Sequence, residues 1–323
     1  MIKVLHLYDN RLSTYAHFVN SLTSAMPNNQ VETDIVNSND AVMDRCRQWK
    51  PDIVHLHGSI APQLPQGVRL VVTPHGENTS VSGAYVIVAR SQMECKRLKE
   101  AGLQRVEIVL NPIITRTISF KEAADQYCAI YRRVMDSNVR QLMSDDTLHM
   151  LHLLLKAAIM GDRRWVESSL ESHAAPDWRQ LFIYARLENI SEELQRGIAI
   201  TGLSAPAVDA SGIKVFLPDG YELPEQMVTT DIGTLLNAVG ADIADKKLPL
   251  CHIVALHKLL ANSNLDEDKL MAELENRNKH LLERLLHIAQ HETLLDEGFM
   301  PSEALNDRTT KKIYQLLTNN LQI

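Results

Sequence analysis

The spacing of apolar residues changes once along this chain, near Pro112, and that change constrains the fold more than any other feature. Before it, short apolar stretches rich in β-branched residues alternate with helical patterns; the stretches are IKVLHLY, VETDIVN, DIVHLH, RLVVT, YVIVA and VEIVL. After it, apolar positions recur at helical spacing. Short strands that alternate with helices form a parallel sheet. The sequence therefore predicts an α/β parallel-sheet domain followed by an all-α helical domain.

Three segments follow from this pattern: residues 1–112 as the sheet domain, 113–145 as a linker with one long helix, and 146–323 as a mostly helical domain. We expect the long helix to run from Ser119 to Met143, because Ser119 and Glu122 can form a capping box at its start. After residue 112 we expect only one strand, IKVFLP, which begins at Ile213.

Composition narrows the class of protein. The 323 residues are 45% hydrophobic, enough to fill a core in each of two domains. A formal net charge of -7 provides no broad basic field, so we do not expect nucleic acid as a partner. The start has no signal-peptide pattern and no apolar run approaches about 18 residues, so we expect no transmembrane segment. Four scattered cysteines without a C-x-x-C pair are typical of a reducing compartment, and we expect a cytoplasmic protein.

Two of the predicted strands are followed by a histidine and a glycine, in PDIVHLHG and LVVTPHG. His55 and His57 alternate with apolar residues, so both imidazoles should point to one face at the end of their strand. His75 comes just after the end of the next strand. We expect His57 and His75 to open onto one crevice, because ligands of parallel sheets bind at the carboxyl ends of the strands. The alternative is that the histidines only bond neighbouring loops and that Gly58 and Gly76 only form turns.

The same stretches, followed by YVIVARSQMECKRLKEAGLQRVEIVLNPI, resemble the amino-terminal domain of family 4 glycosyltransferases of the two-domain GT-B fold. The resemblance covers roughly residues 1–112, and the predicted helix from Ser119 also resembles the helix that crosses back to the first domain in that family. It implies a Rossmann-like sheet, the GT-B half, with His75 as the catalytic residue near the reaction centre. It also places His57 on the wall of the acceptor cleft. The residues that we expect to bind substrate are His55, His57, Gly58, Gly76, Glu77 and Arg90. Arg90 is a candidate, with Arg11 and Lys96, to stabilise the leaving phosphate.

The sequence also departs from the family pattern. Where the family carries a Gly-Gly turn after the first strand, this chain reads YDNRLSTYAHF. The family's second α/β domain, which holds the nucleotide sugar, has no counterpart in the helical pattern. Glu275 and Glu283 have the family's E-x7-E spacing, but they lie in a long charged helical pattern, from Asn264 to Leu295, that we interpret as a solvated face.

The sequence is therefore consistent with two functions. The first is a divergent glycosyltransferase-like protein of cell-surface polysaccharide synthesis, which needs no cofactor besides a nucleotide sugar as donor substrate. The alternative is a non-catalytic binding or scaffold protein that keeps the acceptor-domain fold. The expected partners are a sugar acceptor or nucleotide sugar, and a protein that docks on the helical domain. We predict no metal site, because the helical pairs His287 with His291 and His149 with His152 each lack an identifiable third ligand.

Overall fold

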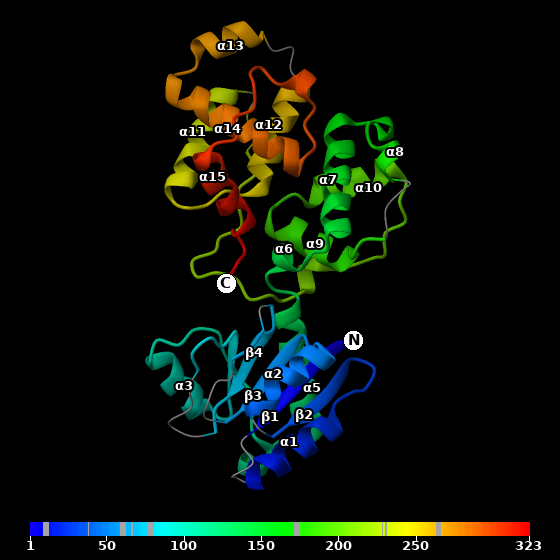
Figure 1. The fold of residues 1–323 in the computed structure, drawn as a ribbon, viewed down its shortest axis with the longest axis vertical. Coiled ribbons are helices and arrows are strands. Elements are labelled where there is room, and N and C mark those ends of the chain that lie inside the picture. The colour runs from blue at the N-terminus through cyan, green and yellow to red at the C-terminus, as the bar shows by residue number, and fades with distance from the viewer. Residues whose placement is uncertain are drawn as a thin grey trace. The chain divides into compact units, whose positions relative to one another are not determined.

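The computed structural model describes residues 1–8, 13–37, 39–58, 63–65, 67–75, 81–170, 175–227, 229, 231–262 and 266–323. The chain divides into two compact units, Met1–Ser137 and Asn138–Ile323. The first unit runs from blue to green and the second from green to red in Figure 1. The division falls inside the segment 113–145 that the sequence assigned to a linker and long helix.

The first unit contains the predicted parallel sheet. Its six strands are β1 (Ile2–Tyr8), β2 (Val31–Val36), β3 (Ile53–His57), β4 (Arg69–Thr73), β5 (Val86–Ala89) and β6 (Val106–Ile108). All five pairings are parallel, in the order β2-β1-β3-β4-β5-β6. This extends the flavodoxin-like order by one strand and differs from the commonest Rossmann order. The order changes direction between β1 and β3, so the switch point lies where Tyr8 is paired with His57.

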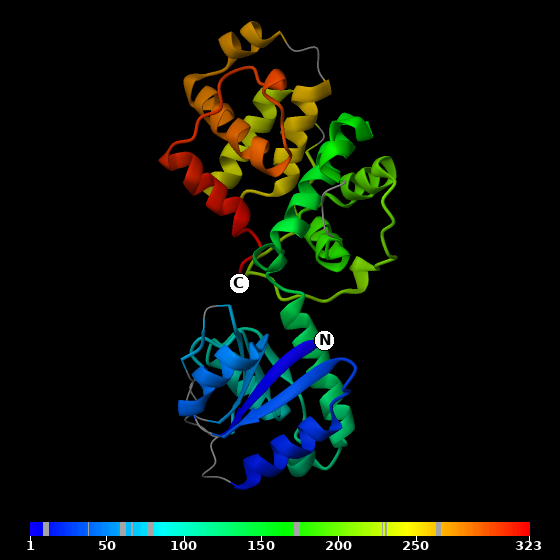
Figure 2. The same ribbon diagram turned by 45° about the vertical axis from the view of Figure 1, so that its right-hand side comes forward.

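Helices cover both faces of this sheet. They are α1 (Ser13–Ala25), α2 (Asn39–Trp49), α3 (Gln92–Glu100), α4 (Pro112–Thr115) and α5 (Phe120–Met135). Helix α2 packs Val42 and Cys46 on the face that carries Leu5, Val54 and Val72. The opposite face is covered by α5, which runs alongside the strands in Figures 1 and 2. Alternation along each strand therefore separates an apolar face from one that carries the histidines.

Helix α5 begins as the sequence predicted and ends earlier. The side chain of Ser119 accepts from the backbone of Glu122, and the side chain of Glu122 accepts in return, so the capping box is confirmed. The predicted continuation to Met143 is wrong: the helix stops at Met135, and a separate short helix begins at Val139. Between them Asn138 has φ +52°, a left-handed conformation that breaks the helix.

The second unit is helical. Its helices are α6 (Val139–Leu142), α7 (Asp145–Met160), α8 (Glu167–Leu170), α9 (Trp178–Leu187), α10 (Ser191–Thr201), α11 (Ile232–Ala244), α12 (Leu250–Asn262), α13 (Glu267–Glu273), α14 (Asn276–Glu292) and α15 (Arg308–Thr318). Residues 213–217 form no strand, so the strand predicted for IKVFLP is wrong. Without a neighbouring strand to complete its backbone hydrogen bonds, the segment instead packs Val215 on the helical core.

A buried polar network stabilises this unit. The Arg140 Nη2 donates to Glu292 Oε1 at 2.6 Å, and Tyr314 donates to the same oxygen at 2.7 Å. Glu188 is fully buried and accepts from the Leu250 amide at 2.7 Å and from Asn320 at 3.1 Å. The network therefore ties the last helices to those at the start of the unit.

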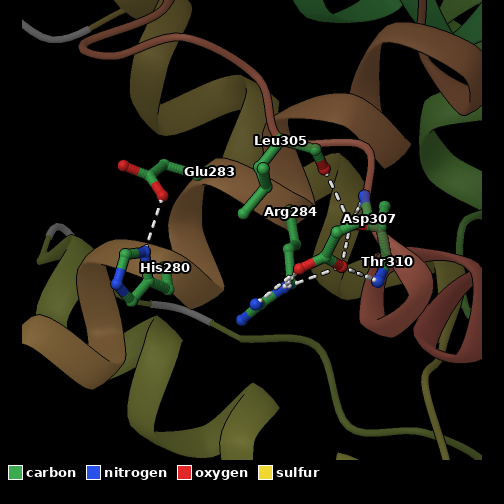
Figure 3. Close-up of polar contacts among 6 residues, drawn as sticks. All are labelled: His280, Glu283, Arg284, Leu305, Asp307 and Thr310. Carbon is green, nitrogen blue, oxygen red and sulfur yellow. Dashed lines mark hydrogen bonds and ion pairs between the residues drawn. The ribbon is translucent and has the colours of Figure 1, made fainter.

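The junction of α14 and α15 is drawn in Figure 3. Arg284 Nη2 lies 2.7 Å from Asp307 Oδ2, and Asp307 also caps α15 by accepting from the Thr310 amide. Glu283, half of the E-x7-E pair, bonds His280 on its own helix at 2.9 Å, which fits the interpretation as a helix face. In the part of the chain that the structure describes, no helix has both the length and the apolar character needed to cross a membrane.

Candidate functional site

Histidines from neighbouring strands meet near the carboxyl ends of the first unit's sheet. His6 lies in β1 opposite His55 in β3, and His57 at the end of β3 lies opposite Thr73. The ring centroids of His55 and His57 are 3.9 Å apart, and those of His57 and His75 are 5.8 Å apart. The sheet therefore brings together the three histidines that the sequence singled out, and adds His6.

His55 is held by hydrogen bonds at both ring nitrogens. Its Nδ1 lies 2.5 Å from the Tyr131 hydroxyl and its Nε2 lies 2.8 Å from Thr73 Oγ1, which in turn lies 3.0 Å from the Tyr127 hydroxyl. Both tyrosines come from α5 and are fully buried. Each of these hydroxyls can donate once and accept, so the polar groups of His55 are satisfied without a ligand.

His6 and His57 form a second, less complete pair. Nδ1 of His6 lies 3.0 Å from Nε2 of His57, and only one of these nitrogens carries the shared proton. The other nitrogen of each ring, Nε2 of His6 and Nδ1 of His57, is buried and has no hydrogen-bond partner within the described part of the chain. One buried donor and one buried acceptor are therefore left unsatisfied.

Burial keeps all four imidazoles neutral. It lowers the pKa of His6 to about 3. Burial, with neighbouring histidines, holds the pKa values of His55 and His57 well below their ordinary value. Burial and then the nearby Arg90 charge lower the pKa of His75 to about 3. These rings can act at neutral pH as hydrogen-bonding groups or metal ligands, but not as cations.

His75 is half-buried and lies beside Arg90. Nη1 of Arg90 is 3.5 Å from Nδ1 of His75, and Nη2 of Arg90 is 3.2 Å from Glu94 Oε1, which fixes the guanidinium. Tyr15 packs its ring 4.4 Å from the His75 ring and donates its hydroxyl to the His75 carbonyl oxygen. Because a guanidinium only donates, Nδ1 of His75 accepts and the ring proton lies on Nε2. That Nε2 is buried and has no hydrogen-bond partner among the residues that the structure describes.

The predicted site residues divide into three groups. His75 and Arg90 lie together at the carboxyl edge, as expected for a binding site. The expectation that His57 opens onto a crevice is wrong, because His55 and His57 are both 0% exposed and Phe18 of α1 packs against the His57 ring. Gly58 is buried directly after β3. Arg11, Gly76 and Glu77 lie outside the described residues.

Four further residues belong to this buried histidine cluster and were not predicted from the sequence: His6, Thr73, Tyr127 and Tyr131. His6 alternates with apolar residues in IKVLHLY just as His55 does in DIVHLH, so strand alternation was a usable signal. The tyrosines carried no such signal, because their helical spacing indicates a buried face without indicating that the face meets histidines.

An open cavity of about 670 Å³ belongs to the second unit, whereas the residues predicted as a site belong to the first. It is lined by the segment Pro218–Glu225, the end of α11 and residues near the carboxyl end of the chain. His252 lies 3.1 Å from Asp242 within it. Burial lowers the pKa of this histidine although Asp242 opposes the shift.

Comparisons with protein-family models, with curated proteins and with solved structures find no match to this chain.

Proposed function

We propose that the chain is a divergent glycosyltransferase-like protein whose first unit binds a sugar, as acceptor or nucleotide sugar, at His75 and Arg90. The observation that carries the proposal is the unpartnered Nε2 of His75, next to an immobilised guanidinium. Both residues follow strands of a parallel sheet, β4 and β5, at the edge where such sheets bind ligands.

The chemistry of these two groups favours a ligand rich in oxygen. A neutral imidazole with its proton on Nε2 offers one donor, and a guanidinium offers several. Sugar hydroxyls and phosphate oxygens accept from both, and a phosphate also gains from the positive charge. Glu94 offsets part of that charge at 3.2 Å, so we expect a nucleotide sugar to bind only weakly.

The alternative, a non-catalytic binding protein, is supported by a different observation. The described residues of the second unit are helical and include no strand, so they do not resemble the α/β donor domain of the family. Transfer from a nucleotide sugar needs amides and cations around the leaving phosphate. In this version of the proposal, the helical unit serves as a docking surface for a protein partner. Both versions place the chain in the cytoplasm, where its four buried free cysteines stay reduced.

Ligand titration followed by NMR tests the proposal, with UDP-glucose and GDP-mannose as probes. We expect saturable binding with a dissociation constant of about 1 mM, roughly -4 kcal/mol. Arg90→Ala should weaken it by about 10-fold or more, because a charged hydrogen bond contributes about 1.5 to 3 kcal/mol. The control is Lys99→Ala, which removes an equal charge from α3, at a position outside the buried layer.

Equal affinity of Arg90→Ala and Lys99→Ala, or no binding of either probe, contradicts the proposal. Release of free nucleoside diphosphate in the presence of wild-type protein separates the two versions, because only a transferase breaks the sugar–phosphate bond.

A further inference from the structure

The histidines inside the first unit form a compact group of ligand atoms. His6, His55 and His57 each offer a ring nitrogen, and these atoms all lie within 4.8 Å of one another. All three side chains are 0% exposed. Within the described ranges this is the one group of three or more histidine, cysteine or acidic side chains with such spacing.

Hydrogen bonding within the protein accounts for only part of this arrangement. His55 is satisfied at both nitrogens, whereas His6 and His57 each keep one buried nitrogen without a partner. The nitrogens of these two rings that face each other are Nδ1 of His6 and Nε2 of His57, 3.0 Å apart, so a metal ion between them would replace the proton that they share.

The surroundings match the requirements of metal ligation. Burial keeps the imidazoles neutral, and the neutral form is the one that coordinates a metal. Histidine ligands usually donate their second nitrogen to a nearby oxygen, which fixes the ring. Thr73 Oγ1 already occupies that position for His55 at 2.8 Å and is itself oriented by Tyr127. The metal would therefore take Nδ1 of His55, which would exchange its bond to the Tyr131 hydroxyl for the metal.

We propose that His6, His55 and His57 bind a first-row transition-metal ion, with Zn²⁺ as the representative. Three imidazoles are a known ligand set for zinc and leave a fourth position for an oxygen ligand. The group contains no carboxylate, which argues against Mg²⁺ and Ca²⁺. Nitrogens around zinc lie about 3.4 Å apart, since each Zn–N bond is about 2.0 to 2.1 Å. The spacing of up to 4.8 Å thus requires ring shifts on the order of 1 Å.

This metal site is independent of the proposed function, because it uses neither His75 nor Arg90. The two sites also differ in place and ligand: the sugar site is at the carboxyl edge of the sheet, and the metal site lies between the sheet and α5.

The test uses the full chain, freed of metal by chelation and then dialysed against Zn²⁺ or Co²⁺. We expect one equivalent of bound metal by elemental analysis, a rise in the unfolding temperature, and the visible absorption of a four-coordinate Co²⁺ site. His6→Gln and His57→Gln should each reduce the affinity at least 100-fold, and Thr73→Val should reduce it about 10-fold.

Two control variants assign the bound metal to this cluster rather than to other histidines. His257 is also 0% exposed with an unpartnered Nε2, but it lies in the second unit, so His257→Gln should keep full metal binding. The neighbouring histidines of α14, with ring centroids 4.6 Å apart, are removed in the double variant H287A/H291A, which should also keep it.

Less than about one tenth of an equivalent of bound metal in the wild type overturns the proposal. So does metal binding that survives in His57→Gln, or that disappears in H287A/H291A. If both cluster variants fail to fold, the wild-type Co²⁺ spectrum decides, because a weakly absorbing six-coordinate spectrum is incompatible with a buried three-histidine site.

Discussion

At the scale of single residues, burial determines what the ionisable groups of this protein do. Four histidines with depressed pKa values lie in the first unit, and Glu188 with a raised pKa lies in the second. Glu188 should therefore contribute to stability with the opposite pH dependence from these histidines, although the second unit also contains His257, whose pKa burial lowers to about 4. The unfolding of each unit can be measured separately through its tryptophans, because Trp49 lies in the first unit and Trp165 and Trp178 lie in the second.

The first unit should lose stability in acid. An unfolded histidine takes up its proton near pH 6.5, whereas folded His6 and His75 stay neutral down to about pH 3. The stabilisation is therefore complete above about pH 6.5 and is lost as the pH falls toward about 3, at about 1.4 kcal/mol per pH unit for each group. The test uses a variant in which Trp165 and Trp178 are replaced, so that Trp49 alone reports unfolding in urea. Its free energy of unfolding should be smaller at about pH 5.5 than at about pH 7.5. Equal values at the two pH values contradict this prediction.

The second unit should show the reverse dependence at Glu188. Burial raises its pKa to about 7, although the Leu250 amide opposes the shift. The folded state therefore binds the proton more tightly than the unfolded state, so the stabilisation is present below about pH 4.5 and lost as the pH rises through about 7. We compare two proteins that both carry Trp49→Phe, one with Glu188 and one with Glu188→Gln. Between about pH 5 and pH 8, the free energy of unfolding of the protein with Glu188 should fall by up to about 3 kcal/mol relative to that of the Glu188→Gln variant. Parallel pH curves for the two proteins contradict this.

At the scale of elements, the close packing of α7 against α10 depends on one glycine. A Cβ on Gly197 would lie 2.1 Å from the Leu154 carbonyl oxygen, so the helices must separate to accept it. We expect Gly197→Ala to reduce the free energy of unfolding by about 1 to 3 kcal/mol. The matched control is Gly240→Ala in α11, where the nearest atom would be Leu281 Cδ2 at 3.8 Å. That change should stabilise by about 0.5 to 1 kcal/mol, because alanine favours helix. Similar effects of both substitutions in denaturant titrations would refute the packing argument.

The same scale shows what the sequence predicts well. All six strands lie where short β-branched runs indicated them, because a strand buried on both faces needs such residues. Helix breaks were harder to predict. The end of α5 near Asn138 and the gap between α13 and α14 at Leu274 interrupt continuous helical patterns. Both breaks depend on backbone conformations that tertiary packing selects. The helical spacing of apolar residues in the sequence does not indicate these conformations.

The sequence predicted the position of the candidate site, but it did not predict that His55 and His57 are buried. Strand alternation placed His55 and His57 on one face, and that is confirmed. Their burial depended on α5, which lies about 60 residues later in the chain and supplies Tyr131 to His55. No local pattern around DIVHLH indicates which helix covers it. His75 was predicted at the carboxyl edge, and its contact with Arg90 follows from β4 and β5 being neighbours.

At the scale of the whole molecule, the first unit extends to Ser137 because α5 completes its core. Ala123, Ala124, Tyr127, Tyr131 and Val134 of this helix are all fully buried. A fragment of residues 1–137 should therefore unfold cooperatively on heating, whereas a fragment of residues 1–112 should not, since one face of its sheet would be exposed. Calorimetry of the two fragments checks this. A cooperative transition for residues 1–112 would show that α5 is not part of the folding unit.

We expect His75 to serve a ligand more than it serves the fold. Unfolding free energy and UDP-glucose affinity, measured on one preparation of His75→Ala, distinguish these two roles. Because the ring is half-buried and its Nε2 bonds nothing, the stability should fall by no more than about 1 kcal/mol. The affinity should fall about 10-fold or more, as expected when a ligand loses a hydrogen bond. A stability loss of about 3 kcal/mol with unchanged affinity in the folded protein would contradict the account and leave His75 as a structural residue.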